Sequence, residues 1–148
     1  MASGIKIKTK DICDALGVGR HQLRSWTDTL APYCDRETKE RSASRYDSGD
    51  LLFFAAIQHI SETFGVSLSY MARFSESLYS CIREPKGLTD TPFVFISDKS
   101  HKCERLRSSK VDQEGVLVDL QIAQNLVYQY LGLSTQQTQL QLGLVKVN

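Results

Sequence analysis

The chain has 148 residues, 41% hydrophobic and 24% charged, with a formal net charge of +1. This balance excludes a disordered polyelectrolyte and argues against a protein that coats nucleic acid without sequence preference. No apolar run approaches the roughly 20 residues of a membrane span, and the N-terminus lacks the apolar region of a signal peptide. We therefore expect a cytoplasmic protein that does not insert into a membrane.

The four cysteines contain no CxxC pair and are expected to be reduced packing residues: Cys13, Cys34, Cys81 and Cys103. His101 and Cys103 form one pair of candidate metal ligands, whereas a zinc site needs three or four. We expect neither a metal ion nor a cofactor.

The first predicted helix covers residues 9–16. Thr9 is a good N-cap, and Asp11 lies in the first turn, where the helix dipole favours a negative charge. Gly17 is expected to end the helix, because glycine readily adopts the left-handed conformation found there. Before the helix, the alternating IKIK at residues 5–8 favours a short strand or an extended lead-in.

A second short helix is predicted over residues 20–30, and the Gly-Val-Gly turn before it completes the outline of a helix-turn-helix. Leu23, Trp26 and Leu30 recur at helical spacing and are expected to pack inward. The other side is polar and carries Arg20, His21, Arg24, Ser25 and Asp28. Such a face suits a DNA major groove, because arginine can hold guanine O6 and N7 with two hydrogen bonds. The pattern is also typical of a solvated helix face, and both interpretations stay open.

Residues 31–49 contain a proline and several serines and predict a loop or hairpin. Beyond Glu40 this segment has only positive charge until Asp47. Hydroxyl groups and backbone N–H groups in such a loop can bind phosphate oxygens without reading sequence. The candidate DNA-contacting residues of the loop are Lys39, Arg41, Ser44, Arg45 and Tyr46.

A core helix is predicted from Asp50 to Gly65, with Ser48 or Asp50 as its cap. Its apolar residues repeat at spacings of three and four: Leu51, Phe54, Ile57, Ile60 and Phe64. Ser67 is expected to cap one further helix, whose apolar positions continue to Ile82. Two prolines and a glycine in residues 83–92 then predict a boundary.

The C-terminal part has a different pattern. Residues 93–97, FVFIS, predict a strand, and a second strand is expected near Cys103–Leu106. Residues 116–131 have helical spacing, and the leucines of the tail alternate at 140, 142 and 144. This helix or the tail is the expected place of oligomerisation, although a helix with one apolar face is more often simply part of the core. Three aromatics are candidates either for a small-molecule pocket or for core packing: Phe95, Tyr128 and Tyr130.

Residues 5–82 resemble the MerR superfamily of winged-helix DNA-binding domains. Four ordered motifs carry the resemblance: Ile12…Ala15-Leu16-Gly17-Val18, Leu23-Arg24 followed by Trp26, Arg45-Tyr46-x3-Asp50-Leu51, and Phe64-Gly65-Val66-Ser67-Leu68. The resemblance implies a mainly α fold with a MerR-like winged helix-turn-helix domain over 1–84. A linker over 85–91 and a small α+β region over 92–148 would follow, and the last matches no family we can name.

The resemblance also implies roles for individual residues. Arg24 matches an arginine of the recognition helix that approaches DNA, and Arg20 and His21 lie where members vary their base contacts. Arg45 matches a wing arginine directed towards phosphate, and Tyr46 a tyrosine that helps to seat the wing. Trp26 matches an aromatic that packs this helix onto the core, and Ser25 replaces an aromatic common in the family. Pro85 and Gly87 interrupt the long coiled-coil helix of MerR-type activators, so the usual dimer and effector site are not implied.

The function that we expect is a sequence-specific DNA-binding transcriptional regulator of bacterial or phage type, associated with the nucleoid. A homodimer would bind a palindromic operator in double-stranded DNA, with helix 20–30 in the major groove and loop 35–46 as the wing. The alternatives are an excisionase-like architectural protein that bends DNA, or a protein-interaction module that retains the winged fold. No enzyme is expected, because the chain has no GxGxxG, P-loop, HExxH or nucleophile elbow.

Overall fold

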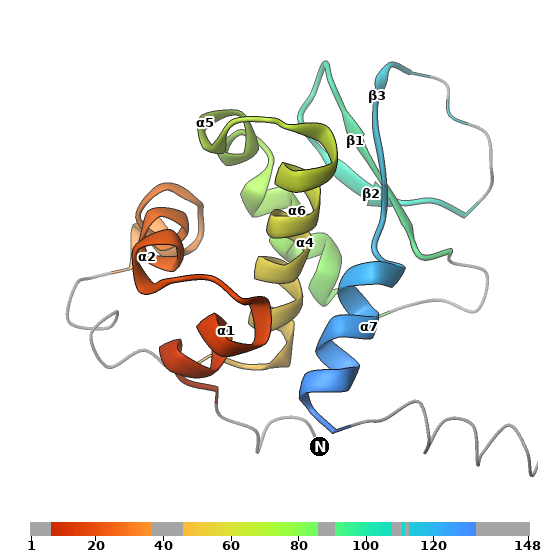
Figure 1. Cartoon of the computed structure of the whole chain (residues 1–148). Helices are drawn as coiled ribbons and strands as arrows, with labels where there is room; N and C mark the ends of the chain where they lie inside the picture. Colours follow the sequence, from red (N-terminus) through yellow and green to blue (C-terminus); the bar gives the residue numbers. More distant parts are fainter. Residues whose placement is uncertain (1–6, 37–45, 86–90, 108–110, 112, 133–148) are drawn as a thin grey trace, which may run out of the picture.

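A computed structural model describes residues 7–36, 46–85, 91–107, 111 and 113–132. The described chain is mainly helical and carries a small three-stranded antiparallel sheet, so its fold is α+β (Figure 1). Within these residues, no helix has both the length and the apolar character needed to cross a lipid bilayer.

The N-terminal helix pair consists of α1 (Thr9–Leu16) and α2 (Arg20–Thr29), close to the predicted bounds. Gly17 ends α1 in the left-handed conformation, with φ of +67°, as predicted. The N-cap is Lys8 and not Thr9, because Asp11 Oδ2 accepts the Lys8 backbone N–H at 2.9 Å and so brings Thr9 inside the helix. The first-turn position of Asp11 is confirmed.

The central helix is α4 (Ser48–Phe64), which follows the short 3-10 turn η2 (Tyr33–Asp35) in the described chain. Asp47 caps it, so the prediction of Ser48 or Asp50 was wrong. The Asp50 N–H donates to Asp47 Oδ1 and the Asp47 N–H donates to Asp50 Oδ2, each at 2.9 Å. Such a reciprocal capping box satisfies two backbone donors that the helix leaves unpaired. Gly65 ends α4 with φ of +65°, as predicted.

Two helices, α5 (Leu68–Ala72) and α6 (Ser75–Arg83), replace the single helix predicted after Ser67. Ser67 does cap α5, because its Oγ accepts the Tyr70 N–H at 3.1 Å. The helical hydrogen bonding breaks at Phe74, whose side chain is buried. Both helices bury their apolar side against the same core, so the apolar spacing runs through the break without a change.

The sheet contains β1 (Phe93–Ser97), β2 (Cys103–Arg105) and β3 (Gly115–Asp119) in the order β2-β1-β3. The two strands predicted at 93–97 and near Cys103–Leu106 are confirmed. The helix predicted over 116–131 was wrong in its first part, because residues 116–119 belong to β3 and α7 (Gln121–Tyr130) begins after Leu120. The alternating leucines of the tail lie outside the described residues.

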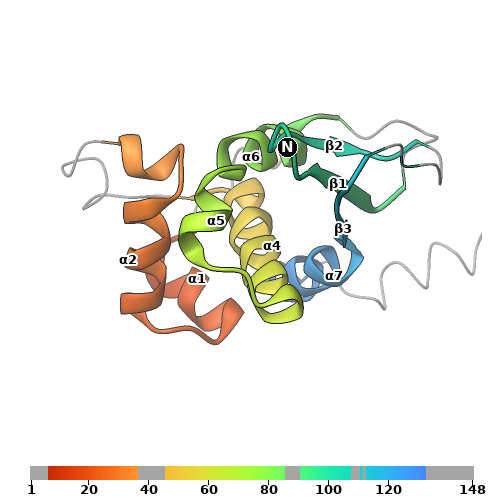
Figure 2. The ribbon, with the colours of Figure 1, turned by 90° about the horizontal axis from the view of Figure 1, so that it is seen from above.

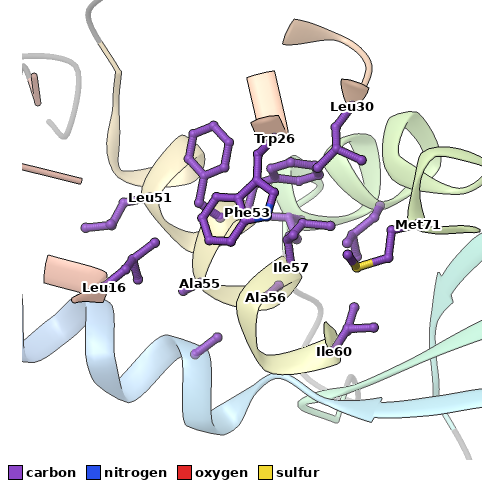
Figure 3. Packing of buried hydrophobic residues seen from close by; sticks show 14 of the residues in the cluster. Leu16, Trp26, Leu30, Leu51, Phe53, Ala55, Ala56, Ile57, Ile60 and Met71 are labelled. Carbon is purple, nitrogen blue, oxygen red and sulfur yellow. The ribbon is translucent and has the colours of Figure 1, made fainter. Parts of the chain in front are cut away.

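One hydrophobic core joins the helices and the sheet, with α4 between α2 and α7 (Figure 2). Trp26 of α2 and Leu16 of α1 point towards α4 in the close view of Figure 3. Val94 of β1 and Val118 of β3 belong to the same buried cluster. The division into 1–84, 85–91 and 92–148 stays a prediction, and residues 86–90 lie outside the described part.

Candidate nucleic-acid interface

Helix α2 separates into a buried and an exposed side, as its sequence predicts. Leu23 and Trp26 are buried in the core. The predicted contact residues of this helix are all exposed and come from its first two turns: Arg20, His21, Arg24 and Ser25. Asp28 is also exposed on this side and has an electrostatic or hydrogen-bonding partner of its own. The exposed side therefore offers two guanidinium groups beside one carboxylate.

The orientation of α2 is set by aromatic packing against α4. The rings of Trp26 and Phe54 stack with centroids 5.9 Å apart and an interplanar angle of 12°. Leu30, which ends the helix, is fully buried. Because a closely packed large ring allows little rotation, the exposed residues of α2 keep a fixed direction relative to α4.

The predicted wing residues Lys39, Arg41, Ser44 and Arg45 lie outside the described residues, so only the ends of that loop can be placed. Tyr46 at its far end forms an antiparallel bridge with Ile7. The Tyr46 N–H donates to the Ile7 carbonyl at 2.7 Å and the Ile7 N–H donates back at 2.8 Å. The end of the loop is thereby held against the start of α1.

The ring of Tyr46 is buried, which corrects its place among the DNA-contacting side chains. Its ring meets the Phe54 ring edge-on, with ring centroids 5.7 Å apart, and its centroid lies 6.3 Å from that of the Tyr33 ring. Only 6% of the residue is exposed, so little of its surface is open to a ligand. Tyr46 is a packing residue that holds the end of this segment against Ile7 and Phe54.

A cluster of charged and aromatic side chains, which we call the Asp–Arg cluster, lies where the loop joins α4. Its members are Tyr33, Asp47, Asp50, Tyr79 and Arg83. Arg83 holds Asp47 with two hydrogen bonds, from Nη2 to Oδ1 at 2.6 Å and from Nη1 to Oδ2 at 3.0 Å. Its Nη2 also donates to Asp50 Oδ1 at 3.0 Å, and the Tyr33 hydroxyl donates to the same oxygen at 2.5 Å.

The protonation of the Asp–Arg cluster favours these bonds at neutral pH. Burial alone would raise the pKa of Asp47, but hydrogen bonds from Arg83 and from the Asp50 backbone lower it to about 2. Burial raises the pKa of Asp50, against the opposing effect of the Tyr33 hydroxyl. Burial and the nearby Asp50 also raise the pKa of Tyr33, which therefore remains a donor. The hydrogen bonds of Asp47 raise the pKa of Arg83, so the guanidinium stays charged.

Two cation–π contacts close the Asp–Arg cluster. The Arg36 guanidinium lies 4.6 Å from the centre of the Tyr33 ring, and that of Arg83 lies 4.5 Å from the centre of the Tyr79 ring. Tyr33 and Tyr79 meet edge-on at 5.7 Å. The cluster thus joins Arg36, just before residues 37–45, to Asp47, just after them, and ties both to α6.

Sequence reasoning missed this cluster. The signal that was available is the Asp-x-x-Asp spacing of Asp47 and Asp50 directly before an apolar run, which is typical of a capping box. Nothing local pairs Asp47 with Arg83, which lies 36 positions away. The sequence indicates only an aromatic residue in a loop at Tyr33, and the contact of its hydroxyl with Asp50 arises from the fold.

The other candidate groups do not come together. Phe95 lies against Gly115 within the sheet, whereas Tyr130 lies beside Asp11 of α1 and Tyr128 is exposed on α7. Phe95 and Tyr130 therefore do not line one pocket. Burial raises the pKa of Cys103 to about 12, and its thiol faces the Phe74 carbonyl at 3.8 Å. In the described part of the chain, no three side chains of histidine, cysteine, aspartate or glutamate are grouped to hold a metal ion.

Comparisons of the chain with known protein families, with curated proteins and with solved structures find no match.

Proposed function

We propose that the chain is a sequence-specific DNA-binding regulator, with α2 in the major groove and loop 35–46 against the DNA backbone. The observation that carries the proposal is a shared scaffold. Phe54 stacks on Trp26, which orients the arginine-bearing helix, and also packs on Tyr46, which ends the cationic loop. One ring of α4 therefore holds both elements, so a single duplex can meet them together.

The charge distribution supports a specific contact more than a general attraction. Arg20 and Arg24 are one turn apart on the exposed side of α2, where each guanidinium can address a guanine. Asp28 on the same side disfavours phosphate but can accept a hydrogen bond from the amino group of cytosine. With a net charge of only +1, affinity has to come from fitted contacts.

A single short helix reads few base pairs, so the proposed regulator binds as a dimer to two half-sites of a palindromic operator. Repression by occupancy needs no further site. Selection of binding sequences from a random duplex pool tests this directly, because a dimer selects an inverted repeat. Recovery of no enriched sequence would refute specific recognition.

Three variants separate base reading from backbone contact. Arg24→Ala is expected to weaken binding to the selected duplex by about 1–3 kcal/mol and to relax base preference. Arg45→Ala is expected to weaken binding to selected and to scrambled duplexes about equally, because a phosphate contact carries no sequence information. Lys102→Ala on the β1–β2 turn removes the same charge from an exposed site and is the matched control. Equal affinity of all three variants and the parent chain would contradict the proposal.

The near-neutral charge and the exposed Asp28 favour one other function, a module that binds protein through the same face. Salt dependence distinguishes the two functions. Binding to duplex DNA weakens steeply with salt, with a log–log slope of about −0.9 for each neutralised phosphate. A shallow slope would favour the protein-binding function. An architectural role uses the same DNA contacts and would appear as a bend in circular-permutation assays.

A further inference from the structure

Strand β3 lies at the edge of the sheet, and its outer side has no partner strand among the described residues. The ladder to β1 shows which groups face outward. The Asp98 N–H donates to Glu114 O at 3.1 Å, and the Leu120 N–H donates to Pro92 O at 2.9 Å. Because backbone hydrogen bonding alternates along an antiparallel strand, the N–H and C=O groups of the even-numbered residues of β3 are directed towards β1. The N–H and C=O groups of Gly115, Leu117 and Asp119 are therefore directed away from β1.

This outward edge is complementary to itself. If two copies meet about a two-fold axis at Leu117, the three outward residues pair as 115 with 119, 117 with 117 and 119 with 115. Each pair exchanges two hydrogen bonds, so the five residues of β3 form a complete ladder. The charged Asp119 then lies opposite Gly115, so no two like charges face each other.

The side chains near this edge also suit a copy of the same chain. Leu117 is 46% exposed, although its strand neighbours Val116 and Val118 turn towards the core. Helix α7 follows directly below β3 in Figure 1 and contains no charged residue. Its Ile122 is 57% exposed. Exposed strand edges attract other strands, and natural proteins usually protect them with charged residues, above all lysine, or with proline. β3 contains neither lysine nor proline, and its one charged residue is Asp119 at its end.

We propose that β3 pairs with β3 of a second copy, giving a continuous six-stranded sheet with Leu117 on the two-fold axis. The second copy is the occupant favoured by the self-complementary register and by the absence of charge opposition. Since α4 separates α2 from α7, this interface leaves the exposed side of α2 open (Figure 2). This β3 interface would supply the dimer that the proposed function needs in order to bind two half-sites.

Charge placed on the axis tests the interface without DNA. By light scattering, the parent chain is expected at twice its 16.7 kDa mass. Leu117→Lys and Leu117→Glu each place a charge opposite its own copy and are expected to weaken the dimer roughly tenfold or more. Mixing the two variants places opposite charges on the axis and is expected to restore a heterodimer. Gln22→Lys adds the same charge on exposed α2 and should leave the dimer unchanged.

A monomeric parent chain overturns the proposal, as does a mixture of the two variants that stays monomeric while each variant is folded. Amide hydrogen exchange of the parent chain supplies an independent reading. The Leu117 amide is expected to be protected at high protein concentration and to exchange rapidly on dilution, whereas Val116 and Val118 stay protected throughout. Protection of Leu117 that persists at a dilution where light scattering finds only the monomer means that the chain covers its own edge, and this also overturns the proposal.

Removal of residues 133–148 tests the tail as that internal cover. The shortened chain is expected to dimerise like the parent chain. Dimerisation only after this removal would assign the edge to the tail and refute the second copy. These measurements are independent of DNA, so their failure leaves the α2 interface standing, and a failure of DNA binding leaves the β3 interface standing.

Discussion

Replacing Arg83 by methionine removes the cation of the Asp–Arg cluster while keeping much of the side-chain volume. Three hydrogen bonds are lost, two to Asp47 and one to Asp50. The bonds to Asp47 lie near the surface, where the two side chains are 32% and 46% exposed, and such pairs contribute about 0–1 kcal/mol. Asp50 is 4% exposed, and loss of a charged hydrogen bond there costs about 1.5–3 kcal/mol. We expect Arg83→Met to lower the free energy of unfolding by about 2–4 kcal/mol.

Thermal unfolding at pH 7 measures this loss. For a chain of this length, about 2–4 °C in Tm corresponds to 1 kcal/mol, so the expected decrease is about 4–16 °C. Arg73→Met is the matched control, because Arg73 is exposed and lies over Tyr70 at 5.8 Å without an ion pair among the described contacts. A Tm of Arg83→Met within about 2 °C of the parent chain would refute the assignment.

The pH dependence of that loss has a definite sign. The pKa of Asp47 in the folded chain is about 2, below its ordinary value of 3.8. A lowered carboxyl pKa contributes stability that is complete above the ordinary value and is lost as pH falls through the folded value. Arg83→Met lacks the part of this contribution that comes from Arg83, so the stability gap between variant and parent is expected to narrow between about pH 4 and pH 2. Protonation of Asp50, whose pKa is raised, also relieves the unpaired charge of the variant.

Three further substitutions test the scaffold, two by chemical denaturation and the third by amide exchange. Phe54→Ala removes the ring shared by Trp26 and Tyr46 and is expected to cost about 3–5 kcal/mol; a loss below about 1 kcal/mol would exclude Phe54 from the core. Gly17→Ala forces a left-handed alanine at φ of +67° and should cost about 1–2 kcal/mol, although its Cβ would meet open space. Gly115→Ala would place Cβ 2.2 Å from the Ile96 carbonyl oxygen, so loss of the β1–β3 ladder is expected in amide exchange spectra.

Local signals predicted those parts of the fold that local chemistry decides. Gly17 and Gly65 end helices in a left-handed turn whose N–H bonds one of the last carbonyls, and glycine adopts this turn without strain. Ser67 caps α5 because its hydroxyl replaces a missing backbone acceptor. The exposed and buried sides of α2 follow from spacing alone.

The secondary-structure predictions are wrong where one apolar pattern fits two kinds of structure. Leu117 and Leu120 fit a helical stripe with Ala123, but Val116 and Val118 also alternate, and pairing with Val94 and Ile96 of β1 decided for a strand. The break at Phe74 leaves the apolar spacing intact because α5 and α6 bury the same side. Long-range pairing between Asp47 and Arg83 has no local signature, so the part of the candidate interface that fixes the loop could not be predicted.

This long-range pairing gives the cluster a consequence that a purely stabilising ion pair would not have. Arg83 joins Asp47, at one end of the proposed wing, to α6. The orientation of the exposed side of α2 is set instead by the stacking of Trp26 on Phe54. If the proposed function holds, Arg83→Met should therefore lose phosphate contacts made by the loop before it loses base contacts made by Arg24. Binding measured well below the Tm of the variant is expected to show a shallower salt dependence with the same order of preferred sequences. An unchanged salt slope, with weaker binding explained by the unfolded fraction alone, would limit the cluster to stabilising the fold.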